Sequence, residues 1–352
     1  MAAKAASIGP VPFKDLVVDT AAAAAAGSGG GLVAARRVVD DVSALPHRTF
    51  FNGAVNMRCY QGCWLLEEWV AGAMELHRHF QPRPDDVIVA SYPKSGTTWV
   101  VALTFATMAR GVYPPADARH PLLRLNPHEC LPFLDKLYST SGTEAKLLEA
   151  LPSPRLLNTH MPLSILPPGT GMPCSGHGCK IVYVCRDPKD MVVSLWHFNK
   201  RVVPDLPLAT TFDSVCSGEV THGPVWDHLL GYWRASRAQP DKVLFLRYED
   251  LLRDPAGNVR KLARFLGVPF SDSEEEAGAV GDIVRLCSFR HLQGLETNKS
   301  GHLGGSYFPH DALFRKGVAG DWVNHLTPEM ARNIDEIFAA KMHAEGLVFP
   351  SL

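Results

Sequence analysis

Short apolar runs alternate with longer amphipathic stretches over most of this chain. Val87–Ala90, Lys180–Cys185 and Val243–Leu246 are apolar at nearly every position, which is typical of strands buried on both faces of a parallel sheet. A helical pattern over Thr98–Met108 follows the first of these runs. This alternation predicts an α/β fold, a single domain in which a central, mainly parallel sheet is flanked by helices.

Capping residues mark the ends of two further predicted helices. Asp187 and Pro188 directly follow the second apolar run and combine an N-cap carboxylate with a proline at the first helical position. A helix from about Pro255 to Leu266 is expected to end at Gly267. The Pro-rich and Gly-rich segments 167–178 and 301–305 indicate loops.

The first 44 residues differ from the rest of the chain. They are rich in Ala and Gly, and Gly27–Gly31 cannot bury enough surface to offset the entropy of ordering it. We expect a flexible arm over residues 1–44, with one short helix near Val33–Val42, and one domain over residues 45–352. Acidic residues in the arm argue against a plastid transit peptide, and its Ala run is too short for a secretory signal, so we expect a cytoplasmic protein.

Composition narrows the class of partner. The chain has 352 residues, and its 35 basic and 36 acidic side chains give a formal charge of −1, without the basic excess that nucleic acid or anionic membrane requires. No window is long and apolar enough to span a membrane. The eight Cys lack the spacing of a paired zinc site, so we expect free thiols and no metal.

The segment Tyr92–Trp99 carries the strongest chemical signal. It reads YPKSGTTW and joins a predicted strand to a predicted helix, where free amides and the helix dipole favour an anion. Gly allows close approach of the backbone, Lys adds a charge, and the hydroxyl residues add donors. This is a P-loop-like phosphate cradle but not the nucleoside-triphosphate loop, because its Lys precedes the Gly by two residues.

Four motifs in order resemble those of the cytosolic sulfotransferase family. PKSGTTW is similar to the family's 5'-phosphosulfate loop, and KIVYVCRDPKDMVVSLWHF is similar to its 3'-phosphate segment. Tyr248–Asp250 lies where the family has its YED motif, and FRKGVAGDWVNH is similar to the family's C-terminal motif. The resemblance runs from about Leu45 to the C-terminus, and CRDPKD, SLWHF and LCSF are similar to the plant branch.

This resemblance implies an enzyme of class EC 2.8.2 that moves a sulfuryl group from 3'-phosphoadenosine 5'-phosphosulfate (PAPS) to a small hydroxylated molecule, releasing PAP. The mechanism implied is in-line displacement without a metal. Catalytic roles fall on His160 as general base and on Lys94. The implied PAPS-binding residues are Lys94, Ser95, Gly96, Thr97, Thr98, Trp99, Arg186, Ser194, Tyr248, Cys287, Ser288, Phe289, Arg315, Lys316 and Gly317. Among them, Trp99 and Phe289 are expected to sandwich the adenine.

The segment around His160 also departs from the family. Many members carry a Lys two residues before this His, whereas this chain has Asn158, so Lys94 would bear more of the charge stabilisation. Ser194 is expected to restrain Lys94. We expect Trp64, Phe133 and Phe198 to help shape the acceptor pocket.

Two other functions fit part of the pattern. A P-loop phosphotransferase or kinase would need Mg²⁺ ligands that the motifs do not supply, and a silent nucleotide-binding module would not need Lys94 and His160.

The Gly-rich segment from Leu292 to Phe314 is expected to be a lid that becomes ordered when nucleotide binds. The family's dimer motif is degenerate here, which favours a monomer or a weak homodimer, without nucleic-acid or membrane partners.

Overall fold

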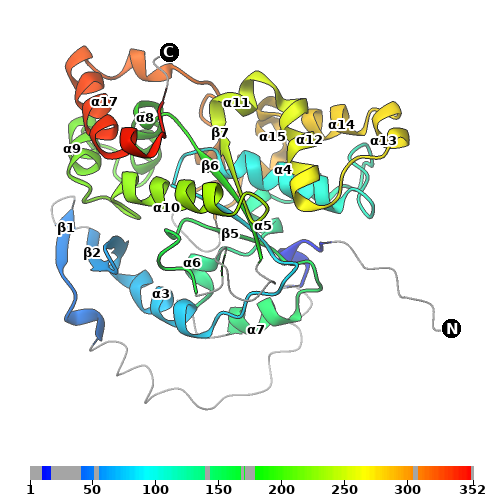
Figure 1. The fold of residues 1–352 in the computed structure, drawn as a ribbon, viewed down its shortest axis with the longest axis horizontal. Helices are drawn as coiled ribbons and strands as arrows, with labels where there is room; N and C mark the ends of the chain where they lie inside the picture. Colours follow the sequence, from blue (N-terminus) through cyan, green and yellow to red (C-terminus); the bar gives the residue numbers. More distant parts are fainter. Residues whose placement is uncertain are drawn as a thin grey trace.

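The structure is a computed structural model that describes residues 10–16, 41–50, 55–138, 143–167, 170, 179–303 and 308–349. At its centre lies a parallel sheet of order β5-β4-β6-β7, with helices on both sides (Figure 1). Its strands are β4 (Val87–Ser91), β5 (Leu156–Thr159), β6 (Lys180–Cys185) and β7 (Val243–Arg247). The predicted α/β class is confirmed.

A smaller antiparallel sheet precedes the central one. Its three strands, in the order β1-β2-β3, were not predicted from the sequence: β1 (His47–Phe50), β2 (Val55–Tyr60) and β3 (Cys63–Leu66). Their side chains are largely half-buried or exposed, so they lack the continuous apolar signal of the central strands.

Alternate side chains of the central strands enter two separate cores. On β4, Val87 and Val89 belong to one core, while Ile88 and Ala90 belong to the other. The Ile88 side is covered by α3 (Glu67–His79), α8 (Pro188–Asn199), α9 (Leu208–Ser217), α10 (Val225–Ala238) and α17 (Pro328–Met342). The Val87 side is covered by α4 (Thr97–Ala109), α12 (Pro255–Leu266) and α14 (Ala279–Leu286). Burial on both faces explains the uninterrupted apolar runs.

Short helices complete the described part of the chain. They are α5 (Pro127–Cys130), α6 (Leu134–Leu137), α7 (Thr143–Ala150), α11 (Tyr248–Arg253), α13 (Asp272–Glu276), α15 (Phe289–Gly294) and α16 (Glu296–Lys299), with the 3₁₀ turns η1 (Pro121–Leu123), η2 (His310–Leu313), η3 (Asp321–Asn324) and η4 (His343–Glu345). In the described segments no helix is long and apolar enough to cross a membrane.

The predicted caps are confirmed. The Asp187 side chain accepts a hydrogen bond from the Lys189 amide at 2.8 Å, and the proline occupies the first turn of α8. Helix α12 ends at Gly267, whose φ of 83° is left-handed. These caps fix where α8 begins, and α8 carries one side of the site described below.

Part of the N-terminal arm lies against the domain. Lys14 pairs with Glu129 at 2.5 Å, and Asp15 pairs with Arg124 at 2.6 Å. The short helix expected near 33–42 lies outside the described residues up to position 40, and residues 41–43 are helical. The loop expected over 167–178 likewise lies mostly outside the described residues.

A buried ion pair joins the entering ends of β4 and β5. The guanidinium of Arg155 donates to both oxygens of Asp86, at 2.8 and 2.6 Å, and both side chains are fully buried. This bidentate geometry compensates the cost of burying the two charges. The pair fixes β5 beside β4, and β5 leads directly to His160.

Candidate active site

The segment between β4 and α4 is a tight turn built around two left-handed residues. Lys94 has a φ of 67° and Gly96 a φ of 107°. A Cβ at Gly96 would lie 2.7 Å from the Tyr248 ring, so only glycine fits there. The hydroxyls of Ser91 and Thr97 lie 2.6 Å apart and join the strand end to the helix start. The first amides of α4 therefore face an open space at the helix N-terminus, where an anion is favoured.

That space is a cavity of about 1730 Å³. With the exception of Ser95, every residue that the sequence assigned to catalysis or to PAPS lines it: Lys94, Gly96, Thr97, Thr98, Trp99, His160, Arg186, Ser194, Tyr248, Cys287, Ser288, Phe289, Arg315, Lys316 and Gly317. The Ser95 side chain is buried, and its amide donates to the Tyr92 carbonyl inside the turn. Of the three expected pocket aromatics, Phe133 and Phe198 line the cavity and Trp64 does not.

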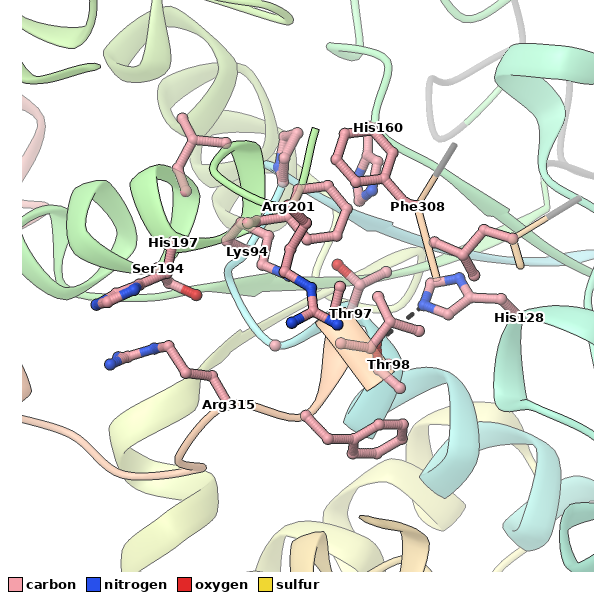
Figure 2. A pocket seen from close by; sticks show the side chains of 18 of the residues that line it. Lys94, Thr97, Thr98, His128, His160, Ser194, His197, Arg201, Phe308 and Arg315 are labelled. Carbon is pink, nitrogen blue, oxygen red and sulfur yellow. Dashed lines mark hydrogen bonds between the residues drawn. The ribbon is translucent and has the colours of Figure 1, made fainter. Parts of the chain in front are cut away.

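Lys94 lies in the middle of this cavity (Figure 2). Its ammonium is 3.8 Å from the centroid of the Phe198 ring. Ser194 lines the same cavity, and the restraint that it is expected to place on Lys94 stays a prediction. Burial, with the nearby charges of Arg186 and Arg315, lowers the pKa of Lys94 to about 7. A half-buried cation with cationic neighbours fits an anionic ligand.

A second group of cations lies at one end of the cavity, where Figure 2 shows Arg315 near Ser194. Arg186 donates to the Val318 carbonyl at 2.7 Å, while its Nε is buried and has no partner among the described residues. Arg315 and Lys316 both donate to Asp321, at 2.5 and 2.6 Å. These donors can rearrange onto a phosphate, which offers the same kind of oxygen acceptor.

Aromatic rings form the wall beside these cations. Trp99 packs edge-to-face on Tyr248, with centroids 5.7 Å apart, and the Arg186 guanidinium lies 4.7 Å over the same Tyr248 ring. A Cβ at Gly317 would lie 2.5 Å from the Phe289 ring, so the backbone approaches that ring as closely as a glycine permits. Flat apolar rings beside bare backbone are suited to a purine base.

His160 occupies the other end of the cavity, directly after β5 (Figure 2). Its Nδ1 lies 2.8 Å from the Ser91 carbonyl, which can only accept, so the ring proton is on Nδ1 and Nε2 carries a lone pair. Its amide donates to Asp135, and its carbonyl accepts from Nε2 of His228 at 2.9 Å. Burial lowers the pKa of His160 to about 4, so the ring is neutral at pH 7.

Comparison with known proteins decides the family. The family model described as "Sulfotransferase domain" matches residues 84–346 of this chain. The chain is similar to cytosolic sulfotransferase 8 of Arabidopsis thaliana, with 44% identity over 310 residues that cover 87% of this chain and 91% of the relative. It is also similar to cytosolic sulfotransferase 1 of the same plant, with 42% identity over 315 residues, covering 88% and 93%. The chain belongs to the sulfotransferase family.

Solved structures agree with this assignment. A candidate steroid sulphotransferase of Arabidopsis thaliana has 34% identity and a TM-score of 0.72, covering 92% of this chain and 99% of that one. The mouse sulfotransferase SULT7A1, solved in complex with PAP, has 26% identity and a TM-score of 0.62, covering 82% and 95%. Family membership confirms the resemblance seen in the motifs and favours the transferase over the kinase and the silent module.

Asn158 has a structural place in this sulfotransferase. Its side-chain nitrogen donates to the carbonyls of Leu131 and Pro132, at 3.0 and 3.3 Å, and the residue is fully buried in β5. It therefore holds the chain before Phe133 and does not line the cavity. The cation that the family places two residues before the His is therefore absent here, while Lys94 lines the cavity.

Sequence reasoning missed several residues that line the cavity. Nε2 of His128 lies 2.9 Å from the Thr98 hydroxyl, and Figure 2 shows this contact as a dashed line. Phe308 stacks on Phe198 with centroids 4.0 Å apart. His222 lines the wall near His160 and was not singled out, because a lone His before a Gly-Pro turn carries no periodic or motif signal. Among the described residues no group of three His, Cys, Asp or Glu is arranged to hold a metal.

Proposed function

We propose that this sulfotransferase transfers a sulfuryl group from PAPS to a hydroxyl group of a small molecule, with His160 as general base. The observation that carries this proposal is the placement of two groups in one cavity. The Nε2 lone pair of a neutral His160 and the ammonium of Lys94 face the same space, beside a phosphate cradle. A base and a cation on either side of one reacting centre suit transfer to a hydroxyl.

The cavity fits PAPS in three respects. Gly96 and Gly317 leave room that a Cβ would fill. Among the described residues, the buried Nε of Arg186 has no partner, and the half-buried Lys94 pairs with no carboxylate. The α4 turn would hold the 5'-phosphosulfate, with Thr97 and Thr98 as donors. The group at Arg186, Ser194, Arg315, Lys316 and Gly317 would hold the 3'-phosphate, while Trp99, Tyr248, Cys287, Ser288 and Phe289 would surround the base.

PAPS supplies an activated sulfuryl group, whose bond to the 5'-phosphate oxygen breaks as the acceptor oxygen bonds to sulfur and PAP leaves. This chain would perform the proton and charge work. His160 would take the acceptor hydroxyl proton at Nε2, while its Nδ1–H continues to donate to the Ser91 carbonyl. Lys94 would stabilise the charge that develops on the departing phosphate oxygen.

The acceptor is a small plant secondary metabolite or a hormone-like molecule. The part of the cavity near His160 is lined by apolar and aromatic side chains such as Trp69, Phe133 and Phe198, which suits a flat or polycyclic scaffold. The names of the Arabidopsis relatives support a cytosolic location. A monomeric or weakly dimeric state stays a prediction.

A sulfonation screen tests this function. The purified full chain is incubated with PAPS and a panel of phenols, flavonoids, steroids and hydroxylated acids, and the products are detected by mass. We expect at least one acceptor to gain one sulfuryl group, with PAP formed in equal amount. ATP with Mg²⁺ in place of PAPS should give no phosphorylated product. Phosphoryl transfer, or PAP binding without any turnover, would contradict the proposal.

A further inference from the structure

A second histidine beside His160 is held in an unusual backbone conformation. His222 has a φ of 64°, in the left-handed region that is unfavourable for a non-glycine residue. The surrounding backbone fixes it there, because its amide donates to the Trp64 carbonyl at 2.6 Å and the Gly223 carbonyl accepts from the Trp64 amide at 3.0 Å. Strained residues persist where their environment dictates them, often at functional sites.

A buried carboxylate orients the His222 ring. Nε2 of His222 lies 3.2 Å from Asp135, and both side chains are at most 2% exposed. Asp135 also accepts from the Thr159 hydroxyl at 2.5 Å and from the His160 amide. All of these partners are donors, as an ionised carboxylate requires. Burial alone would raise the pKa of Asp135, but the hydrogen bonds from His222 and Thr159 help to lower it overall.

This hydrogen bond determines which nitrogen of His222 is available. A carboxylate only accepts, so the ring proton lies on Nε2 and Nδ1 carries the lone pair. Nδ1 is buried and has no hydrogen-bond partner among the described residues. A buried polar atom left without a partner destabilises the protein. The residue belongs to the cavity wall, so a ligand bound there can supply the missing donor.

The two histidines are close enough to act on one acceptor. Their ring centroids are 5.7 Å apart, and both rings line the cavity. We propose that His222, held by Asp135, is a specificity-determining residue that accepts a hydrogen bond from a second hydroxyl of the acceptor, adjacent to the hydroxyl that is sulfated. This inference rests on the proposed function, since it assumes that His160 binds the reacting hydroxyl.

The geometry selects a class of acceptor. Hydrogen bonds of about 2.8 Å must reach two oxygens from rings whose centroids are 5.7 Å apart. This separation allows both bonds to reach one acceptor whose two oxygens are close neighbours, as in a catechol or a vicinal diol, and that is the class we infer. The second group must be a donor, because the unpartnered lone pair of His222 only accepts. A methyl ether at that position would leave the lone pair without a partner.

Matched acceptors test this inference. The kcat/KM of the wild-type enzyme is measured for catechol, for resorcinol, whose second hydroxyl is displaced, and for 2-methoxyphenol, which lacks the donor, with larger diol and mono-ol pairs from the screen alongside. We expect the adjacent-diol member of each pair to be preferred by about tenfold or more, the usual effect of one good hydrogen bond. His222→Phe removes the lone pair and should bring this ratio close to one.

Two further variants keep the result interpretable. His222→Asn suits a left-handed backbone but is too short to reach the same oxygen, so it should also lose the preference without added strain. His197 is a cavity histidine on the Arg315 side, and His197→Phe should keep the preference for the diol. PAP affinity and melting temperature confirm that the variants fold. A diol preference that survives in both His222 variants, or wild-type turnover that does not distinguish the pairs, would overturn the inference. A wild-type enzyme that sulfates no acceptor at all would instead contradict the proposed function.

Discussion

At the scale of single residues, His160 depends on its neighbours for its chemistry. The Ser91 carbonyl accepts a hydrogen bond from Nδ1, and Asp135 and His228 bind the amide and the carbonyl of the His160 backbone. The sequence identified His160 through the resemblance of its motif, but its tautomer follows from Ser91, a residue 69 positions away. Motifs name residue types, whereas protonation states depend on contacts that are distant in sequence.

We expect His160→Ala to lower kcat by about 100-fold or more, because general-base assistance to the acceptor hydroxyl is lost. PAP affinity should change little, since His160 lies at the acceptor end of the cavity. Single-turnover kinetics with saturating PAPS and calorimetric titration with PAP measure the two quantities. Turnover close to that of wild type would refute the role of His160 as the base.

Lys94 predicts a pH dependence of nucleotide binding. With a pKa of about 7 in the free protein, lowered by burial and by two arginines, its amine is neutral at higher pH and must take up a proton to pair with the anion. PAP affinity should therefore be full below pH 7 and fall between pH 7 and 9, by at most about tenfold per unit for one linked proton. Calorimetry across this range should show the slope in wild type, and Lys94→Met should lose it. Equal slopes in both proteins would be evidence against this assignment.

The 3'-phosphate assignment is tested by two arginine substitutions. Arg186→Ala and Arg315→Ala should each weaken PAP by about 1.5–3 kcal/mol, the range for a hydrogen bond to a charged group. Adenosine 5'-phosphosulfate, which lacks the 3'-phosphate, should lose much less. Because Arg315 is held by Asp321 before the ligand arrives, part of its contribution offsets that existing bond. Equal losses for the two nucleotides would show that these arginines bind another part of the ligand.

At the scale of elements, the strands buried on both faces were the easiest to predict. β6 spans Lys180–Cys185, and α12 spans Pro255–Leu266, as the apolar run and the capping residues indicated. The segment from Leu292 to Phe314 is different. Its sequence has few apolar residues that could pack into a core, yet the structure forms α15, α16 and η2 in it. Buried Asn298 contacts both Asn126 and the Leu292 carbonyl. Side-chain amides that satisfy backbone groups leave no periodic signal in a sequence.

The lid nevertheless stays a specific prediction. Phe308 stacks on Phe198, whose ring lies against the Lys94 ammonium, so the segment contacts the cation that PAPS would engage. Both ends of the segment adjoin expected nucleotide contacts, Phe289 and Arg315. We expect hydrogen exchange in 292–303 and 308–314 to slow when PAP saturates the protein, while α17 is unaffected. Exchange that is the same with and without PAP would exclude a lid.

At the scale of the whole molecule, the cavity joins segments that are far apart in sequence. It is lined by the turn after β4, by α8, by the start of α15 and by the Arg315 segment, which come from both cores of the sheet. The ordered motifs identified nearly all of the residues that line the cavity around Lys94 and Arg315, because each motif carries a chemical signature, and their roles in binding nucleotide stay a prediction. The end near His160 was predicted only in part: Phe133 and Phe198 were expected there, whereas His222, Trp69 and Phe308 line the cavity through packing that leaves no motif in the sequence.

A ligand that bridges such distant segments should stabilise the domain as one unit. At 100 times its dissociation constant, PAP should raise the free energy of unfolding by about 2.7 kcal/mol, because it binds only the folded state. The melting temperature should rise by a few degrees with PAP.

ATP, which lacks the 3'-phosphate that Arg186 and Arg315 are assigned to bind, should raise the melting temperature much less at the same concentration, with or without Mg²⁺. Arg315→Ala should reduce the PAP shift and leave the ATP shift nearly unchanged. A larger shift with ATP and Mg²⁺ than with PAP would favour a phosphotransferase site, because a 3'-phosphate site has no reason to prefer a γ-phosphate.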